Sequence, residues 1–249
     1  MSPRLTFAIE AAKRAGQSTL RHFGKGVQVE TKADRTPVTV ADREAEAMIR
    51  AEIQAQFPED EILGEEEGGS TSPNRWVIDP IDGTKSFVSG VPLFATLISY
   101  ESDGAPSLGV CYFPALDEIV FAERGYGCFW NDSACRVSTV SDLSEAVICC
   151  AGHDGLVKTG KLEGVLKLAS QCMATRTWCD AYGHALVATG RAEAMIDPRV
   201  SRWDVSPMKV IVEEAGGRFT DFQGVDLLAD EAISTNVALH RSILDAFRA

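Results

Sequence analysis

The chain has 249 residues, of which 45% are hydrophobic and 24% charged, and its formal net charge is −12. This composition is typical of a globular protein with a substantial hydrophobic core. The acidic excess argues against a surface built to bind nucleic acid or anionic lipid, because either partner would be repelled at long range. An anionic substrate would therefore need a local binding device. A bound metal ion can supply one by inverting the potential of an acidic cleft.

The sequence pattern predicts no leader segment and no membrane span. Charged residues interrupt the apolar ones within residues 1–14, and no window approaches about 18 uninterrupted apolar residues. We therefore expect a cytoplasmic protein. The seven cysteines include no C-x-x-C pair, so we expect reduced and mostly buried thiols.

The first half of the chain is predicted as two helices against a mainly antiparallel sheet. Pro3 gives a helix-start signal, and apolar residues recur at helical spacing as far as Phe23. Asp42 is predicted to cap a second helix that ends before Pro58. The predicted strands are 61–63, 76–78, 93–100, 107–112 and 118–122. Residues 113–117 are predicted to form the turn of an antiparallel hairpin.

Beyond residue 140 the predicted helices and strands alternate, which is typical of an α/β unit. The predicted helices are 161–171, 181–189, 205–214 and a last one that ends at 247, and the predicted strands are 194–196, 218–220 and 232–234. We place a boundary in the segment 138–144. This gives an N-terminal lobe of residues 1–140 and a C-terminal lobe of residues 141–249.

The most informative segment is Trp-Val-Ile-Asp-Pro-Ile-Asp-Gly-Thr-Lys at residues 76–85. An apolar strand runs directly into two aspartates, and Pro80 fixes the turn between them. The carboxylates of Asp79 and Asp82 can then converge on one point with the carbonyl of Ile81. Hard cations such as Mg²⁺ prefer oxygen ligands of this kind.

A simpler interpretation of this segment is a polar turn in which Asp82 caps a helix. An EF-hand calcium loop is excluded, because its alternating acidic positions are absent. Gly83 and Thr84 are predicted to open a short helix, whose free N–H groups could bind phosphate. Metal ions on one side and these N–H groups on the other would hold a phosphoryl group.

Two more acidic positions are candidate ligands. Glu65 follows the predicted strand 61–63, and neighbouring strands could bring it close to Asp79. Taken alone, the glutamate-rich loop at 64–69 is more typical of a solvated surface. Asp204 starts a strongly periodic helix, where its simplest role is an N-cap. However, two adjacent divalent ions need at least one more carboxylate than the first lobe provides.

Together and in this order, these segments resemble the inositol monophosphatase family of lithium-sensitive, metal-dependent sugar phosphatases. The resemblance rests on Gly-Glu-Glu at 64–66, Asp-Pro-Ile-Asp-Gly-Thr at 79–84, Trp-Asp at 203–204 and Glu-Ala-Gly-Gly at 214–217. It implies a Mg²⁺-dependent phosphomonoesterase, with Mn²⁺ as a possible substitute. It also implies an α/β fold of alternating helix and sheet layers in two lobes, paired as a homodimer.

The resemblance implies a ligand set for the metal ions. One ion would be held by Glu65, Asp79 and the Ile81 carbonyl. A second would be held by Asp79, Asp82 and Asp204. A third and weaker ion would be bound near Glu65 through water.

The resemblance also implies catalytic and substrate-binding roles. The attacking water would be activated by the ions beside Glu65 and oriented by Thr84, whose hydroxyl would be placed by Asp42. Phosphate would lie against the N–H groups of Gly83 and Thr84. Asp82 and Asp204 would also border the substrate. No covalent enzyme intermediate is needed.

Within the family, the sequence is more similar to the histidinol-phosphatase branch of histidine biosynthesis. The matching segments are 36–39, 41–43, 82–87, 90–93 and 180–183. Inositol-type members usually have small neutral residues around 178–180 and a glutamate at 197, where this chain has Asp180 and Asp197. Two carboxylates would suit a substrate that carries an ammonium group, such as histidinol phosphate. Alternatively, Asp180 caps a helix and Asp197 ends a strand before Pro198.

Two departures from the family pattern concern Glu67, which extends the acidic loop, and Cys179, which replaces a common glycine.

The alternative functions are an inositol or other polyol monophosphatase with the same machinery, and a binding or regulatory protein on an inactive phosphatase fold. The complete set of carboxylates argues against the second. Nucleotide 3′-phosphatases and fructose bisphosphatases are disfavoured, because their insertions and basic substrate loops are not evident.

Overall fold

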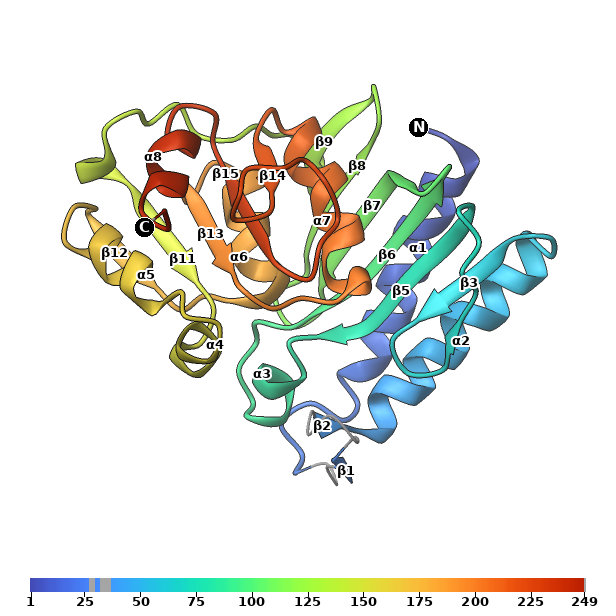
Figure 1. The fold of residues 1–249 in the computed structure, drawn as a ribbon. Helices are drawn as coiled ribbons and strands as arrows, with labels where there is room; N and C mark the ends of the chain where they lie inside the picture. Colours follow the sequence, from blue (N-terminus) through green and yellow to red (C-terminus); the bar gives the residue numbers. More distant parts are fainter. Residues whose placement is uncertain (27–29, 32–36, 249) are drawn as a thin grey trace.

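The computed structural model describes residues 1–26, 30–31 and 37–248 (Figure 1). Thr36, in the matching segment 36–39, lies outside the described residues. The helices are α1 (Pro3–Thr19), α2 (Val40–Gln56), α3 (Thr84–Val88), α4 (His153–Lys158), α5 (Leu162–Ala169), α6 (Asp180–Ala188), α7 (Arg202–Glu214) and α8 (His240–Asp245), with a 3-10 helix at Leu143–Glu145.

The larger sheet runs in the order β10-β9-β8-β7-β6-β5-β3-β4. Its strands are β3 (Glu61–Gly64), β4 (Gly68–Gly69), β5 (Arg75–Asp82), β6 (Ala95–Ser102), β7 (Ala105–Phe113), β8 (Glu118–Glu123), β9 (Gly127–Trp130) and β10 (Ser133–Ala134). Strands β3 and β5 are parallel, and the other neighbouring pairs of this sheet are antiparallel.

The smaller sheet runs in the order β12-β11-β13-β15-β14. Its strands are β11 (Val147–Cys150), β12 (Ala174–Arg176), β13 (Ala194–Asp197), β14 (Arg218–Thr220) and β15 (Ala232–Thr235). Strand β11 is parallel to β12 and β13, whereas β15 is antiparallel to both of its neighbours. A separate antiparallel pair is formed by β1 (Glu30–Thr31) and β2 (Pro37–Val38).

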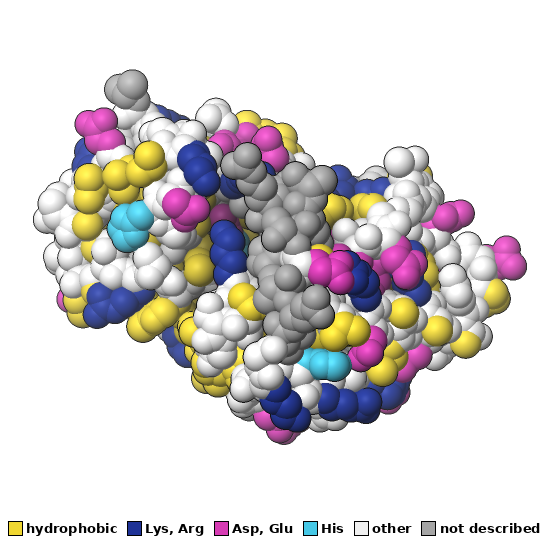
Figure 2. All heavy atoms as spheres, turned by 90° about the horizontal axis from the view of Figure 1, so that it is seen from below, with side chains coloured by type: hydrophobic (Ala, Val, Ile, Leu, Met, Phe, Trp, Pro, Cys, Tyr) yellow, Lys and Arg dark blue, Asp and Glu magenta, His cyan; other side chains and the backbone are white. Residues whose placement is uncertain are grey.

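Helices and sheets alternate in layers (Figure 1). Helices α1 and α2 cover one face of the larger sheet, α6 and α7 lie between the two sheets, and α4, α5 and α8 cover the outer face of the smaller sheet. The predicted α/β layering is therefore confirmed. The lower face of the molecule, shown in Figure 2, carries interspersed basic and acidic side chains.

The alternation of side chains along β7 separates two of the hydrophobic cores. Val110 and Tyr112 pack with α1, whereas Cys111 and Phe113 pack with α6 and α7. All side chains of β5 are buried, because helices cover both faces of the sheet. Trp76 and Ile78 face α1 and α2. Because successive side chains of a strand point to opposite faces of the sheet, Asp79 points toward the face covered by α7.

Several local predictions were wrong. The first helix ends at Thr19 and not near Phe23. Thr39 and not Asp42 is the N-cap of α2, because Asp42 occupies the third helical position of a capping box. Strands β9 to β12 and helix α4 were not predicted.

The two sheets use separate parts of the chain. The larger one draws on residues 61–134 and the smaller one on residues 147–235. However, α6 and α7 share one hydrophobic core with strands of both sheets, including Leu97 of β6 and Ala232 of β15. The division into lobes at residue 140 stays a prediction.

Candidate active site

The structure brings Glu65 close to Asp79, as the sequence predicts. Strands β3 and β5 are parallel, with Gly64 opposite Ile78. The C-terminal ends of both strands therefore lie at the same edge of the sheet. The Glu65 N–H donates to the Ile78 carbonyl at 3.2 Å and continues the ladder. The charge of Glu65 is a main reason, after burial, why the pKa of Asp79 is raised well above its ordinary value.

A β-bulge shapes the turn between the two aspartates of β5. Asp79 is paired with Leu97 and Asp82 with Ala95, so two residues of β5 lie opposite one residue of β6. Oδ1 of Asp79 accepts a hydrogen bond from the Ile81 N–H at 3.0 Å. The bulge therefore fixes the backbone at the point where Asp79 and Asp82 converge.

Asp204 completes a cluster of three carboxylates. One carboxylate oxygen from each of Asp79, Asp82 and Asp204 lies within 4.8 Å of the others. Asp204 is the third residue of α7 and accepts a hydrogen bond from the Ser201 N–H at 2.7 Å. The N-cap is Ser201, so the N-cap interpretation of Asp204 was wrong.

The start of α7 is tied to the larger sheet by Glu101, which the sequence analysis missed. Glu101 is fully buried in β6. Its Oε1 accepts hydrogen bonds from Arg202 Nε at 2.7 Å and Ser206 Oγ at 2.9 Å, and its Oε2 accepts one from Arg75 Nε at 3.1 Å. This network holds Asp204 against the ends of the sheet. The predicted strand ended at residue 100, so nothing in the sequence signalled that Glu101 is buried.

The acidic loop after β3 is also held by a buried glutamate that the sequence analysis did not single out. Glu46 of α2 accepts hydrogen bonds from the N–H groups of Glu66 at 2.8 Å and Glu67 at 3.0 Å. Arg50 neutralises it with an Nε–Oε1 distance of 2.8 Å. A Cβ atom at Gly64 would lie 2.3 Å from Glu46 Oε1, so the glycine allows this close approach.

Asp82 links the cluster to α6. Its Oδ2 accepts a hydrogen bond from the Ala181 N–H at 2.9 Å. The adjacent Asp180 has a left-handed backbone with φ of 57°, and a Cβ atom at Gly83 would lie 3.1 Å from its Oδ2. Asp180 therefore lies beside Gly83 and close to the carboxylate of Asp82. Cys179 is the N-cap of α6, so Asp180 is not the cap.

Burial and mutual repulsion raise the pKa of the clustered carboxyls. The pKa of Asp82 is raised by burial and then by the charges of Asp180 and Asp204. Burial and the charge of Glu65 contribute to raising the pKa of Asp204 to about 7, although the Ser201 N–H opposes them. Burial and the charges of Asp180 and Asp204 also raise the pKa of Asp197. Such a cluster needs cations or protons for charge balance.

Thr84 and Asp42 do not make the hydrogen bond that the resemblance implied. The Thr84 hydroxyl donates to the Ile81 carbonyl at 3.1 Å. Oδ2 of Asp42 accepts from the Thr39 N–H and hydroxyl at 2.8 and 2.6 Å, because the capping box of α2 uses it. Oδ1 of Asp42 is buried and has no hydrogen-bond partner among the described residues. The charge of Glu65 is among the causes that raise the pKa of Asp42, so Asp42 lies near the site.

Asp197 ends β13 on the same side of the molecule as the cluster, as its effect on the pKa of Asp82 shows. His184 of α6 lies behind it, with Nε2 4.0 Å from Asp197 Oδ2. His184 Nδ1 lies 2.8 Å from Ser234 Oγ. Burial lowers the pKa of His184 to about 3, so the imidazole is neutral at pH 7.

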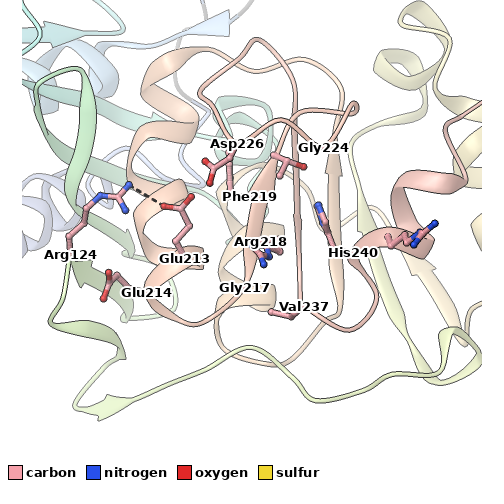
Figure 3. Close-up of a pocket in the computed structure, with 12 residues that line it drawn as sticks. Arg124, Glu213, Glu214, Gly217, Arg218, Phe219, Gly224, Asp226, Val237 and His240 are labelled. Carbon is pink, nitrogen blue, oxygen red and sulfur yellow. Dashed lines mark hydrogen bonds and ion pairs between the residues drawn. The ribbon is translucent and has the colours of Figure 1, made fainter.

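A cavity of about 720 Å³ lies elsewhere, at the C-terminal end of α7 (Figure 3). It is lined by Glu213 and Glu214 of α7, Arg218 of β14, and His240 of α8. The carboxylate cluster lies at the opposite end of the same helix, so this cavity is not part of the candidate active site.

The sequence pattern of the inositol monophosphatase family matches residues 1–249. The chain belongs to this family. A histidinol-phosphatase of Chlorobaculum parvum is 44% identical over 99% of this chain and 97% of its own. An inositol-1-monophosphatase of Mesorhizobium japonicum is 35% identical over 99% and 97%. A solved IMPase structure from Thermotoga maritima has a TM-score of 0.93 and 32% identity, covering 99% and 97%.

These relatives are named phosphatases that hydrolyse phosphoric monoesters, and this family member is an enzyme of that class. The family fold agrees with the layered architecture described above. Among the described residues, no helix is long and apolar enough to cross a membrane.

Proposed function

We propose that this phosphatase hydrolyses histidinol phosphate to histidinol and depends on Mg²⁺. The observation that carries the proposal is the convergence of Asp79, Asp82 and Asp204, with two further carboxylates, Asp180 and Asp197, at its border. The first group is suited to metal ions and the second to an ammonium group. Histidinol-phosphatases of Mycobacterium tuberculosis and Streptomyces coelicolor, at 38% and 37% identity, support this substrate.

The residues present fit divalent metal ions. Carboxylates and backbone carbonyls are the ligands that Mg²⁺ prefers. The unpartnered Oδ1 of Asp42 adds a buried acceptor near Glu65. We propose Glu65, Asp79 and the Ile81 carbonyl as one ligand set, and Asp79, Asp82 and Asp204 as the other. Mg²⁺ in these positions supplies a Lewis acid that lowers the pKa of water and stabilises charge on phosphoryl oxygens.

The chain's own groups would bind and orient the reactants. The N–H groups of Gly83 and Thr84 begin α3 beside Asp82 and would donate to the phosphate oxygens. The Thr84 hydroxyl already donates to the Ile81 carbonyl, so its oxygen remains an acceptor that can orient water. Asp42 would act on Thr84 only if the Thr84 hydroxyl turned from the Ile81 carbonyl to the unpartnered Oδ1 of Asp42.

Asp180 and Asp197 would select the substrate. Each is close enough to Asp82 to raise its pKa, so both border the position of the phosphoryl group. A carboxylate that accepts a hydrogen bond from an ammonium group contributes about 1.5–3 kcal/mol. Inositol phosphates offer only neutral hydroxyls in its place. The same site could still accept them, and the inositol-1-monophosphatases among the relatives make polyol phosphates the second candidate.

The test is phosphate release from a panel of four substrates: histidinol phosphate, inositol monophosphate, a sugar bisphosphate and a 3′-phosphonucleotide. The proposal predicts the highest kcat/KM for histidinol phosphate. A higher kcat/KM for inositol monophosphate would make polyol phosphates, and not histidinol phosphate, the preferred substrates.

We also propose that the protein forms a homodimer in the cytoplasm. Light scattering of the purified protein would test the dimer.

A further inference from the structure

Two cysteines face one another at the base of the β9–β10 hairpin. In this hairpin Trp130 is paired with Ser133, and Phe129 with Ala134. The Cys135 N–H donates to the Cys128 carbonyl at 2.9 Å, so the next pair along the ladder is Cys128 and Cys135. Their sulfur atoms are 3.4 Å apart, and both thiols are free.

This arrangement needs little change to accept a disulfide. Residues that are directly opposite in an antiparallel ladder have Cα atoms about 4.5–5.5 Å apart. A disulfide needs a Cα separation of about 4.4–6.8 Å and a sulfur separation of about 2.0 Å. Side-chain rotation can therefore close the gap while the hairpin keeps its pairing. We propose that Cys128 and Cys135 form a redox-active dithiol, which hydrogen peroxide or a small organic hydroperoxide converts to a disulfide.

The two thiols differ in the way that such a reaction requires. Cys135 is only partly buried, and its pKa is lowered by the hydrogen bond with Cys128 and by the charge of Arg191. Cys128 is buried in the core, and its pKa is raised by the same hydrogen bond and by burial. Cys135 is therefore the attacking thiolate and Cys128 the resolving thiol.

The other cysteines are less suited to react. Burial raises the pKa of Cys149 to about 12, and it also raises the pKa of Cys179, which lies beside Asp180. Cys149 and Cys150 are neighbours in β11 and pack into different cores. Burial raises the pKa of the remaining thiols as well. Among the seven cysteines, all of them described, Cys135 alone has a lowered pKa.

The reaction balances without a further reactant. The Cys135 thiolate attacks one peroxide oxygen, the O–O bond breaks, and a sulfenic acid and hydroxide form. The Cys128 sulfur then attacks the sulfenic sulfur, the S–O bond breaks, and its proton leaves with the hydroxyl group as water. The two thiols lose two electrons in total and the peroxide gains them. With hydrogen peroxide the products are one disulfide and, once hydroxide is protonated, two waters; an organic hydroperoxide gives an alcohol in place of one of the waters.

The bridge would lie between the two strands at the edge of the larger sheet, against a hydrophobic core. Cys128 belongs to the core that contains Ala181 and Ala185 of α6 and Met208 of α7. These helices carry Asp180 and Asp204. Oxidation would thus close the base of a hairpin whose strand β9 contacts α7 and shares one hydrophobic core with α6.

Peptide mapping tests the proposal on the intact protein and does not depend on its substrate. Trypsin cleaves after Arg124 and Arg136, so both cysteines lie in the single peptide 125–136. The protein is treated with hydrogen peroxide, denatured and alkylated. We expect this peptide to become two hydrogens lighter and resistant to alkylation, and to regain two alkyl groups after dithiothreitol. The peptide 177–191, which contains Cys179, should keep its alkylation under the same conditions.

Two variants separate the roles. Cys128→Ser should leave a sulfenic acid at Cys135 that dimedone labels, whereas Cys135→Ser should give no label in this peptide. The proposal is overturned if the wild-type peptide 125–136 stays doubly alkylated, or if Cys179 is oxidised before it. The wild-type mapping decides the question even if a variant does not fold.

Discussion

The carboxylate of Asp82 accepts a hydrogen bond from the backbone N–H of Ala181, at 2.9 Å. This bond joins the end of β5 to the start of α6, two elements that are 99 residues apart in sequence. It also places Asp180 beside Gly83. The candidate metal ligands and the candidate specificity residues therefore share one rigid junction. A substitution in one group should alter the position of the other.

Replacing Thr84 tests the orientation of water. Thr84→Ala removes the hydroxyl that donates to the Ile81 carbonyl. We expect kcat to fall roughly 100-fold with a small change in KM, because the hydroxyl orients a reactant and contributes little to ground-state binding. Steady-state kinetics on histidinol phosphate measure this. Thr84→Ser, which keeps the hydroxyl, is the control and should retain most of kcat. A large rise in KM with unchanged kcat would assign Thr84 to substrate binding.

Replacing Asp180 tests substrate selection. Asp180→Asn removes the charge, and asparagine tolerates the left-handed backbone at this position. We expect kcat/KM for histidinol phosphate to fall roughly tenfold or more, because a charged hydrogen bond contributes about 1.5–3 kcal/mol. The kcat/KM for inositol monophosphate should fall much less. An equal loss for both substrates would show that Asp180 acts through Asp82 or the backbone and not through the ammonium group.

The buried Glu101 should be important for stability. Glu101→Gln leaves Arg75 without its counter-ion in the interior. The free energy of unfolding should fall by about 3–5 kcal/mol, which is the usual cost of leaving a buried charge unpaired. Urea denaturation measures it. The control is Glu52→Gln, which breaks the more exposed pair with Arg14 and should cost less than about 1 kcal/mol. Similar losses in both variants would refute the role of the Glu101 network.

The raised pKa of Asp204 predicts a pH-dependent stability without metal ions. Burial and the charge of Glu65 raise it to about 7, so the folded state binds a proton that the unfolded state releases near pH 4. The contribution of Asp204 to the free energy of unfolding should therefore fall as pH rises from about 4 to 7. The buried His184 acts in the opposite sense, because its lowered pKa favours folding at higher pH.

The measurement compares Asp204→Asn with the unmodified protein in a chelator. The asparagine variant should gain stability relative to the unmodified protein as pH rises over this window, since it cannot ionise. Added Mg²⁺ should reduce the gain by stabilising the ionised cluster. A stability difference that does not vary with pH would mean that Asp204 titrates normally.

The fold and the carboxylates could be predicted because their signals are local. The spacing of Asp79 and Asp82 around Pro80, directly after an apolar strand, predicted that the two carboxylates converge, whereas the bulge between them was not predicted. The supporting residues could not be predicted in this way. Glu46 is one of several charged residues in its helix and Glu101 follows the end of the predicted strand 93–100, and their importance depends on distant partners such as Arg202, which is 101 residues from Glu101. The capping box of Thr39 and Asp42, by contrast, is a local signal that the sequence analysis missed when it made Asp42 the cap.

Removal and return of the metal ion tests the central claim most directly. Phosphate release from histidinol phosphate is measured after chelation, and then during titration with Mg²⁺, for the unmodified protein, Asp82→Asn, and the surface control Asp103→Asn. We predict that chelation abolishes the activity and that Mg²⁺ restores it in the unmodified protein and the control. Asp82→Asn should stay at least about 100-fold lower, since Lewis-acid catalysis supplies several kcal/mol and each 1.4 kcal/mol is about tenfold in rate. Full activity in the chelator would contradict the account.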